Sequence, residues 1–263
     1  MKSQFFKKQF YTLLLFFTVL VSFVINSPTA LAQSRVKNIV LVHGALVDAS
    51  TWKSVYQILT AKGYHVSVVQ NPLTSLEDDV AAVNKMLDKI SGPAILVGHS
   101  WAGAVITEAG VSPKVAGLVY VAAFQPDAGE SAFKQFSSAP ASKVNCLLPP
   151  DSAGFIYGDK AKFRAGFAAD VPADQVAFMY ASQIPVAVKA LATPLTQAAW
   201  KTKPSWGIVP TADQSINPVI ERAAYKRSGA KITEIKGASH CVYISHAAEV
   251  AAVIEDAANK SIK

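Results

Sequence analysis

From residue 36 onward, short apolar runs recur along the chain, and helix-like segments separate them. Each run is almost continuously apolar, and several end in glycine, proline or small polar residues, which is typical of strands buried on both faces. We expect six such strands, at VKNIVLVHG, YHVSVVQNP, PAILVGHS, VAGLVYVAAF, PSWGIVP and AKITEIKG. Buried strands that alternate with helices predict an α/β fold, with a mostly parallel central sheet flanked by helices on both faces.

The segments between the runs carry helix signals. The stretch at 73–92 offers Thr74 or Ser75 as an N-cap, acidic residues in its first turn and Lys89 near its end, all of which favour a helix. Further helices are expected at residues 49–63, 101–109 and 218–229 and from about residue 246.

The alternation stops at Gln125 and resumes at about Lys203. The stretch between them is rich in alanine, proline and aromatic residues, and it contains helical pieces such as AKFRAGFA and ADQVAFMYASQ. Because the sheet pattern resumes directly after it, we interpret residues 125–203 as a helical lid inserted into one domain. Its many aromatic and few charged residues favour an apolar or aromatic substrate, although packing within the lid accounts for many of them equally well.

The N-terminal segment has the features of a secretory signal. Three lysines precede the apolar run YTLLLFFTVLVSFVI, and the sequence ALA then provides a cleavage site after Ala32. We expect a signal peptide at 1–32, a mature domain at 33–263 and a periplasmic or secreted location. Contact with a membrane is expected only if the segment stays uncleaved, and its apolar run is short for a span of about 20 residues.

Composition excludes some classes of function. The chain has 263 residues, of which 51% are apolar, enough for a sizeable core. The formal charge of +7 falls to about +4 without the three lysines of residues 1–32. The remaining basic residues are scattered, without a run of five or more, so no binding of nucleic acid is expected.

Two cysteines, Cys146 and Cys241, lie far apart in the sequence. They match neither a C-x-x-C redox motif nor a zinc-binding pattern, so no metal site is expected. In an oxidising compartment they could form one disulfide that ties the lid to the rest of the domain. Two free, buried thiols are the alternative.

The motif GHSWAG, at residues 98–103, follows the third predicted strand. A nucleophilic serine on a sharp strand-to-helix turn needs small residues two positions before and after it. Gly98 and Ala102 both meet this need around Ser100, although glycine is usual at the second position. A serine that only caps a helix is the alternative interpretation.

A nucleophilic serine needs a base, and the base needs an acid to hold it in the right tautomer. On a sheet of this type the chain order is serine, acid, histidine. Only His240 and His246 follow Ser100. His240 lies in a loop just after the last predicted strand, at the carboxyl end where such sheets place their sites. His246 begins a helix, where a capping or surface role is expected.

Asp213 is the predicted acid, because it follows a predicted strand by three residues and so belongs to the same sheet edge as His240. A turn-forming aspartate in TADQ is the alternative. The other acids after Ser100 lie in the lid or its edges, on helices or inside a strand. We set aside Glu108, Asp127, Glu130, Asp151, Asp159, Asp170, Asp174, Glu221 and Glu234 for that reason.

An oxyanion needs preorganised N–H donors. The backbone N–H of Trp101, directly after the predicted nucleophile, is one candidate. The N–H of Ala45, in the loop after the first strand, is the other, since Gly44 permits an unusual backbone there. His43 and His99 are expected to support these turns rather than to act in catalysis.

Four segments together resemble the α/β-hydrolase superfamily: LVHGALVDASTW, LVGHSWAG, VPTADQSINP and KGASHCVYISHAAEV. Within it, the chain looks most like the small lidded serine esterases related to plant methylesterases and hydroxynitrile lyases, with their bacterial relatives. The resemblance implies a triad of Ser100, Asp213 and His240, oxyanion donors at Ala45 and Trp101, a lid formed by the insertion and no cofactor.

We therefore expect a secreted serine hydrolase that cleaves a carboxylic ester or lactone of a small molecule through an acyl-enzyme. Lyases of the resembled group carry a lysine directly after the catalytic histidine, and Cys241 at that position disfavours cyanohydrin cleavage. Acyl transfer or hydrolysis of a carbon–carbon bond on the same triad is one alternative. A protein that binds ligands without turnover is another, because fold alone does not decide function.

Overall fold

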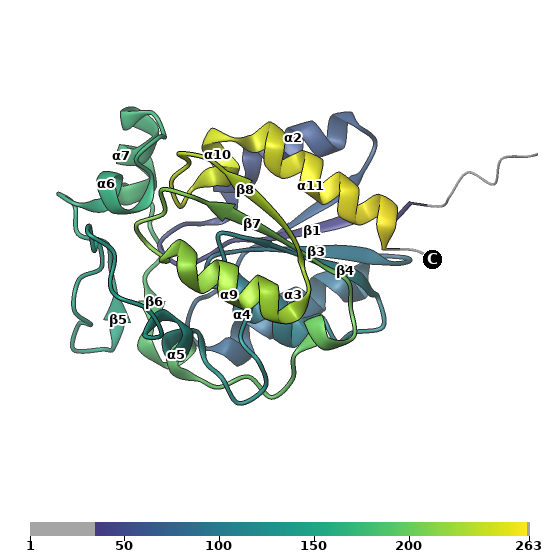
Figure 1. The fold of residues 1–263 in the computed structure, drawn as a ribbon, viewed down its shortest axis with the longest axis horizontal. Helices are drawn as coiled ribbons and strands as arrows, with labels where there is room; N and C mark the ends of the chain where they lie inside the picture. Colours follow the sequence, from purple (N-terminus) through teal and green to yellow (C-terminus); the bar gives the residue numbers. More distant parts are fainter. Residues whose placement is uncertain (1–34, 262–263) are drawn as a thin grey trace, which may run out of the picture. The chain divides into compact units, whose positions relative to one another are not determined.

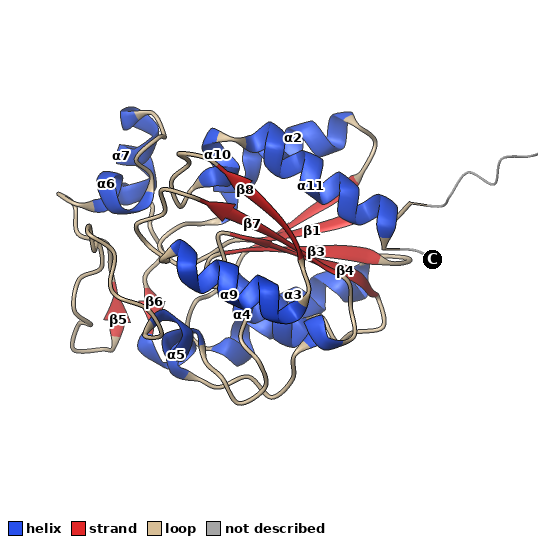
Figure 2. Cartoon of the chain, in the orientation of Figure 1, coloured by secondary structure: helices blue, strands red, loops and turns tan. Residues whose placement is uncertain are grey.

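A computed structural model describes residues 35–261 of the chain. The predicted signal peptide at 1–32 lies outside the described residues. Figure 2 shows strands stacked side by side between two groups of helices. Among residues 35–261, no helix is long and apolar enough to cross a bilayer.

The central sheet has six parallel strands in the order β2-β1-β3-β4-β7-β8 (Figure 1). The strands are β1 (Asn38–Val42), β2 (His65–Val69), β3 (Ala94–His99), β4 (Val115–Val121), β7 (Ser205–Pro210) and β8 (Lys231–Ile235). Each lies within one of the six apolar runs, so the predicted α/β fold with a parallel sheet is confirmed.

Two layers of helices cover the sheet (Figure 1). One layer contains α2 (Lys53–Ala61), α10 (Val242–Ser245) and α11 (Ala247–Lys260), and the other contains α3 (Leu76–Lys89), α4 (Ala102–Ala109) and α9 (Pro218–Ser228). A 3₁₀ turn, η1 (Ala49–Trp52), precedes α2. The cap of α3 is Ser75, whose Oγ accepts a hydrogen bond from the Asp78 N–H at 3.0 Å.

Alternate residues of the strands enter two separate cores. Ile39 and Leu41 of β1 pack with α2 and α11, whereas Val40 and Val42 pack with the opposite layer. Successive side chains of a strand point to opposite faces, so a strand with both faces covered must be apolar at every position. The unbroken apolar runs in the sequence have this cause.

The segment between β4 and β7 contains strands as well as helices. It comprises α5 (Ala132–Phe136), β5 (Phe155–Ile156), α6 (Phe163–Phe167), α7 (Ala173–Ala181), β6 (Val186–Ala187), α8 (Val188–Ala192) and a 3₁₀ turn, η2 (Ala199–Lys201). β5 and β6 pair antiparallel. An all-helical insertion was expected, but strands of two residues are too short to leave a periodic pattern. In Figure 1 the part of the insertion from α5 to β6 gathers at one end of the sheet.

Candidate active site

Four predicted site segments meet at one edge of the sheet. Ala45 follows β1, Ser100 follows β3, Asp213 follows β7 and His240 follows β8. All six strands are parallel, so their carboxyl ends share an edge, and the insertion lies against it. Ala45, Ser100 and His240 line one cavity there, together with Trp101.

Ser100 occupies a sharp turn between β3 and α4. Its φ is +54°, a conformation that residues other than glycine seldom adopt and that typically costs about 1–3 kcal/mol. Its N–H donates to the Val121 carbonyl at 3.1 Å, and its carbonyl accepts from the N–H groups of Gly103 and Phe124 at 3.0 and 3.2 Å. These bonds hold the strained backbone, which leaves the side chain 8% exposed at the cavity.

Two glycines allow this turn to pack tightly. A Cβ at Gly98 would lie 2.6 Å from the Ala102 carbonyl oxygen, and one at Gly103 would lie 2.0 Å from the Phe124 carbonyl oxygen. Ala102 itself is fully buried without displacing the turn. The alanine in GHSWAG is therefore accommodated, and the steric demand falls on the glycine that follows it.

Replacing Gly103 with alanine should lower the free energy of unfolding by about 3 kcal/mol, because the new methyl group must displace the backbone at Phe124. Urea denaturation monitored by circular dichroism measures this loss. The matched control is Ala102→Gly, which should change stability by no more than about 1 kcal/mol. Equal stability of Gly103→Ala and wild type would contradict the packing argument.

Asp213 and His240 form a buried pair. The His240 Nδ1 lies 2.6 Å from Asp213 Oδ2, and both side chains are fully buried. The other carboxylate oxygen of Asp213 accepts from the N–H groups of Ser215 and Ile216 at 2.7 and 2.9 Å. A carboxylate in this position fixes the proton on Nδ1 and leaves Nε2 as an acceptor.

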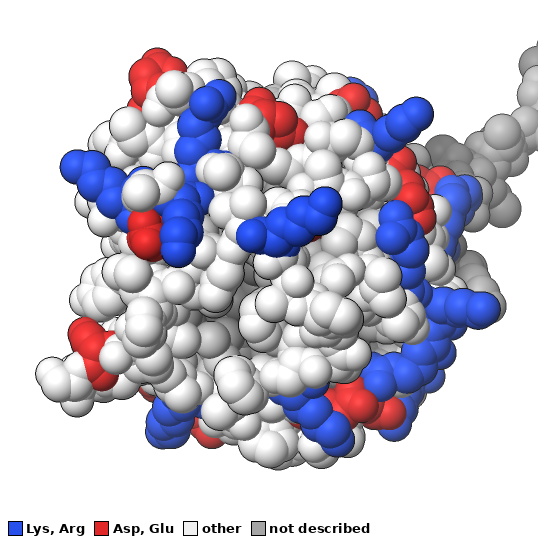
Figure 3. Space-filling view, turned by 60° about the vertical axis from the view of Figure 1, so that its left-hand side comes forward, with Lys and Arg blue, Asp and Glu red and all other residues white. Residues whose placement is uncertain are grey.

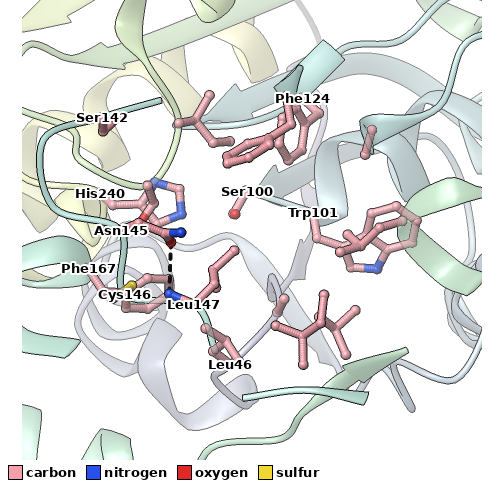
Figure 4. Close-up of a pocket in the computed structure, with 18 of the residues that line it drawn as sticks. Leu46, Ser100, Trp101, Phe124, Ser142, Asn145, Cys146, Leu147, Phe167 and His240 are labelled. Carbon is pink, nitrogen blue, oxygen red and sulfur yellow. Dashed lines mark hydrogen bonds between the residues drawn. The ribbon is translucent and has the colours of Figure 1, made fainter. Parts of the chain in front are cut away.

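The His240 Nε2 has no hydrogen-bond partner among residues 35–261, so the Ser100 hydroxyl is not bonded to it in this structure. Both groups nevertheless face the same cavity (Figure 4). Catalytic hydrogen bonds are often long in proteins without substrate and tighten when substrate binds.

His99 and His43 lie beneath the site. The His99 Nε2 donates to the His240 carbonyl at 3.2 Å, and its ring lies 4.6 Å from the His240 ring. Burial, together with the nearby charge of His240, holds the pKa of His99 well below its ordinary value. His43 donates to the Gly44 carbonyl at 2.8 Å and accepts from the Asn71 N–H at 2.8 Å, and burial also lowers its pKa. Both rings are neutral supports.

The backbone N–H groups of Ala45 and Trp101 are available to a ligand. Within the described residues, neither donates a hydrogen bond, and both residues line the cavity beside Ser100. The neighbouring Leu46 has a φ of +63° and donates its own N–H to the Ile184 carbonyl at 3.1 Å. Two unpaired N–H groups next to a serine hydroxyl suit an oxyanion.

Asp79 was interpreted from sequence only as an acid in the first turn of a helix, but it is fully buried beside the Ser100 turn. Its carboxylate accepts from the indole N–H of Trp101 at 2.7 Å and from the Leu73 N–H at 2.8 Å. Leu73 has a φ of +59°, and its carbonyl accepts from the N–H of Ala187 in β6. Asp79 thus connects the Ser100 turn to the insertion.

Burial raises the pKa of Asp79 to about 6 against the effect of its two hydrogen bonds. The folded state therefore favours the protonated carboxyl. The resulting contribution to the free energy of unfolding is fully present below pH 4 and is lost as pH rises through 6. On account of Asp79, the free energy of unfolding of the wild type should fall by up to about 3 kcal/mol between pH 4 and 7, and Asp79→Asn should lack this fall. Urea denaturation across this range measures it, with the exposed Asp88→Asn as control. Parallel pH curves for wild type and Asp79→Asn would contradict the prediction.

Glu221 had been set aside as a residue on a helix face, yet its side chain in α9 is fully buried. No N–H or O–H group among residues 35–261 donates to either of its oxygens. Burial, and then the negative charge of Asp213, raise the pKa of Glu221 well above its ordinary value.

A short part of the insertion, residues 166–170, is bonded to both loops that carry the predicted acid and base. The Asp170 carboxylate accepts from the backbone N–H of Ser239 at 3.0 Å and from its hydroxyl. The Gly166 carbonyl accepts from Ser215 Oγ at 2.8 Å. Ser239 precedes the predicted base directly, so these bonds help to position it. Asp170 had been set aside from sequence because it lies in the insertion.

The cavity is bounded largely by the insertion and is mainly apolar (Figure 4). No Asp, Glu, Lys or Arg from the described part of the chain lines it. Its apolar residues are Ala45, Leu46, Trp101, Phe124, Ala132, Phe133, Phe136, Ala141, Cys146, Leu147, Ile156, Phe167, Val186, Leu191 and Ile216. Figure 3, in which the left-hand side of Figure 1 is turned forward, shows a hollow in the surface that is bordered mainly by uncharged residues. Such a cavity suits a neutral, largely apolar molecule.

The structure decides between the two alternatives for the cysteines: no disulfide joins them within the described residues, so the disulfide hypothesis is wrong and two free, buried thiols are observed. Cys146 lines the cavity, Cys241 follows His240, and both are free and buried. Burial raises the pKa of Cys146 to about 11 and that of Cys241 well above its ordinary value, so both are inert thiols. Within residues 35–261, no group of three or more His, Cys, Asp or Glu side chains is arranged to hold a metal ion.

A model of the alpha/beta hydrolase family matches residues 39–253. The chain belongs to this family. This alpha/beta hydrolase is 26% identical over 246 residues to an alpha/beta hydrolase of Aspergillus novofumigatus, which covers 86% of this chain and 98% of that one. It is 33% identical over 136 residues to a carbendazim hydrolyzing esterase of a Nocardioides species, which covers 46% of this chain and 53% of that one.

Solved structures agree with this assignment. A pyrethroid hydrolase from Sphingobium faniae superposes on this alpha/beta hydrolase with a TM-score of 0.70 and 23% identity, over 86% of this chain and 98% of that one. The superposition shows a shared fold. The family inferred from the sequence motifs is therefore confirmed, and by family the chain is an enzyme of the alpha/beta hydrolase class.

Proposed function

We propose that this alpha/beta hydrolase is a serine hydrolase that cleaves a carboxylic ester or lactone through an acyl-enzyme. The observation that carries the proposal is the buried Asp213–His240 pair, whose free Nε2 faces the cavity that contains Ser100. The strained turn at Ser100 and the two unpaired N–H groups beside it support the same chemistry.

The chemistry proceeds in two halves. Ser100 attacks the carbonyl carbon as His240 takes its proton, and the oxyanion accepts hydrogen bonds from the N–H groups of Ala45 and Trp101. His240 then protonates the leaving oxygen, which departs as an alcohol. Water, activated by the same histidine, attacks the acyl group and releases the acid. Asp213 stabilises the imidazolium form of His240 in both halves.

The apolar cavity supports a neutral substrate with an apolar or aromatic group. The Nocardioides relative carries the name esterase, and the Sphingobium neighbour carries the name pyrethroid hydrolase. These names agree with hydrolysis of small ester-like molecules. Export to the periplasm or outside the cell remains part of the proposal on the strength of residues 1–32 alone, and a mature N-terminus at Gln33 would test it.

The proposal is tested by two measurements on the purified protein. Short p-nitrophenyl esters should be hydrolysed, and a fluorophosphonate should label the protein at Ser100, as located by peptide mass spectrometry. A folded protein that shows neither hydrolysis nor labelling would overturn the proposal. Acyl transfer is distinguished by adding a competing alcohol, since a transferase forms the new ester in preference to the free acid.

A further inference from the structure

The two sides of the cavity differ in chemistry. In the view of Figure 4, Asn145 and His240 lie on the same side of Ser100 and Phe124 lies on the other, and all four residues line the cavity. Gln214, another polar lining residue, follows Asp213 in the loop bonded to His240. Asn145 thus places a polar group on the His240 side of Ser100, where the apolar Phe167 also lies with its ring 5.0 Å from the His240 ring, whereas the Phe124 side is apolar.

The carboxamide of Asn145 has a defined orientation. The Leu147 N–H donates to Asn145 Oδ1 at 2.9 Å, and since a backbone N–H only donates, this atom must be the oxygen. The amide nitrogen therefore occupies the other position, and Figure 4 shows it on the side of Ser100. Asn145 is exposed, and among residues 35–261 no group accepts a hydrogen bond from this nitrogen, so its two N–H bonds are open to solvent or to a ligand in the cavity.

The direction of the proposed reaction places one part of the substrate next to Asn145. His240 must protonate the leaving oxygen, so the leaving group has to lie on the His240 side of Ser100. The acyl group then extends toward Phe124 and the apolar side. An amide beside the leaving group can distinguish alcohols by their acceptor atoms.

We propose that Asn145 is a specificity-determining residue that donates a hydrogen bond to an acceptor oxygen in the leaving alcohol. The preferred substrates are then neutral esters that join an apolar acyl group to an oxygen-bearing alcohol, such as an ether alcohol. This inference rests on the proposed function. The inference goes beyond the proposed function because it assigns the acyl and alcohol parts of the substrate to opposite sides of the cavity.

A matched pair of substrates tests the inference. The 2-methoxyethyl and butyl esters of hexanoic acid have nearly the same shape and differ by one oxygen in place of a methylene group. Their kcat/KM values, each divided by the rate constant for alkaline hydrolysis, should favour the methoxyethyl ester by about 5-fold in wild type, the size expected of one neutral hydrogen bond.

Two variants identify the donor. Asn145→Leu removes both hydrogen-bonding atoms, and Asn145→Asp keeps the acceptor for the Leu147 N–H but replaces the donor with a second acceptor. Both should bring the ratio for the two esters to one or below. Because the ratio is taken within each variant, a general loss of activity cancels.

Equal normalised rates in wild type would overturn the inference without any variant, as would a wild-type ratio that survives in both variants. So would failure to hydrolyse either alkyl ester while p-nitrophenyl esters are cleaved. In each case, labelling of Ser100 by a fluorophosphonate would leave the proposed function intact. Absence of all ester hydrolysis and of labelling in the folded protein would overturn both.

Discussion

Replacing Ser100 with alanine should lower kcat/KM for p-nitrophenyl esters by about 10⁵- to 10⁶-fold and abolish labelling by fluorophosphonate. Among residues 35–261, no other hydroxyl group combines a strained strand-to-helix turn with two free N–H donors and the open Nε2 of His240. Losses of this size are typical when the nucleophile of a serine hydrolase is removed. Initial rates measured at high enzyme concentration, with ester hydrolysis in buffer subtracted, provide the number.

The control for Ser100→Ala is Ser182→Ala. Ser182 lies at the end of α7, where its hydroxyl donates to the Phe178 carbonyl within the helix, outside the cavity. This variant should retain wild-type rates and labelling. If Ser100→Ala kept more than a hundredth of the wild-type activity, a different nucleophile would have to be sought.

Replacing Asp213 with asparagine should lower kcat by about 10⁴-fold with little change in the fold. The N–H groups of Ser215 and Ile216 donate to one carboxylate oxygen, so the carbonyl of an asparagine would be held there. Its NH₂ group would then face the His240 Nδ1, which lies 2.6 Å from the second oxygen in wild type. An NH₂ group can only donate, so His240 must accept at Nδ1 and carry its proton on Nε2.

A histidine in that tautomer cannot take the proton of Ser100, which is the reason for the large loss. The matched control is Asp174→Asn, an exposed aspartate in the first turn of α7, which should leave kcat unchanged. Steady-state kinetics near neutral pH compare the two variants. A loss of less than tenfold in Asp213→Asn would show that Asp213 does not hold the tautomer of His240.

The sequence predicted the sheet well because burial on both faces leaves a strong local signal. Val40 and Ile39 enter different cores, and both must be apolar for that reason. The candidate site residues could be proposed together because each follows a predicted strand, and parallel strands bring their carboxyl ends to one edge. His240 was preferred to His246 because it lies in a loop just after the last predicted strand, whereas His246 begins a helix. The structure places His246 at the N-cap of α11, where its Nδ1 lies 3.7 Å from Asp170 Oδ2.

What could not be predicted depends on contacts between segments far apart in the chain. In the sequence, Asp79 resembles any acid in the first turn of a helix. Only the hydrogen bond that it accepts from the indole N–H of Trp101 distinguishes it. Glu221 carries no local sign that it is buried beside Asp213. The free state of Cys146 and Cys241 depends on how the insertion folds back over the sheet, and sequence spacing carries no information on that.

The bonds made by residues 166–170 set a practical limit on exchanging substrate pockets among members of the family. A chimaera that replaces the whole insertion would also remove the acceptors of Ser215 and Ser239, and with them part of the support for Asp213 and His240. A graft confined to residues 133–160 would change much of the cavity wall, including Phe136, and spare that support. The insertion thus divides into a part that can be redesigned and a part that must be kept together with the loops that carry Asp213 and His240.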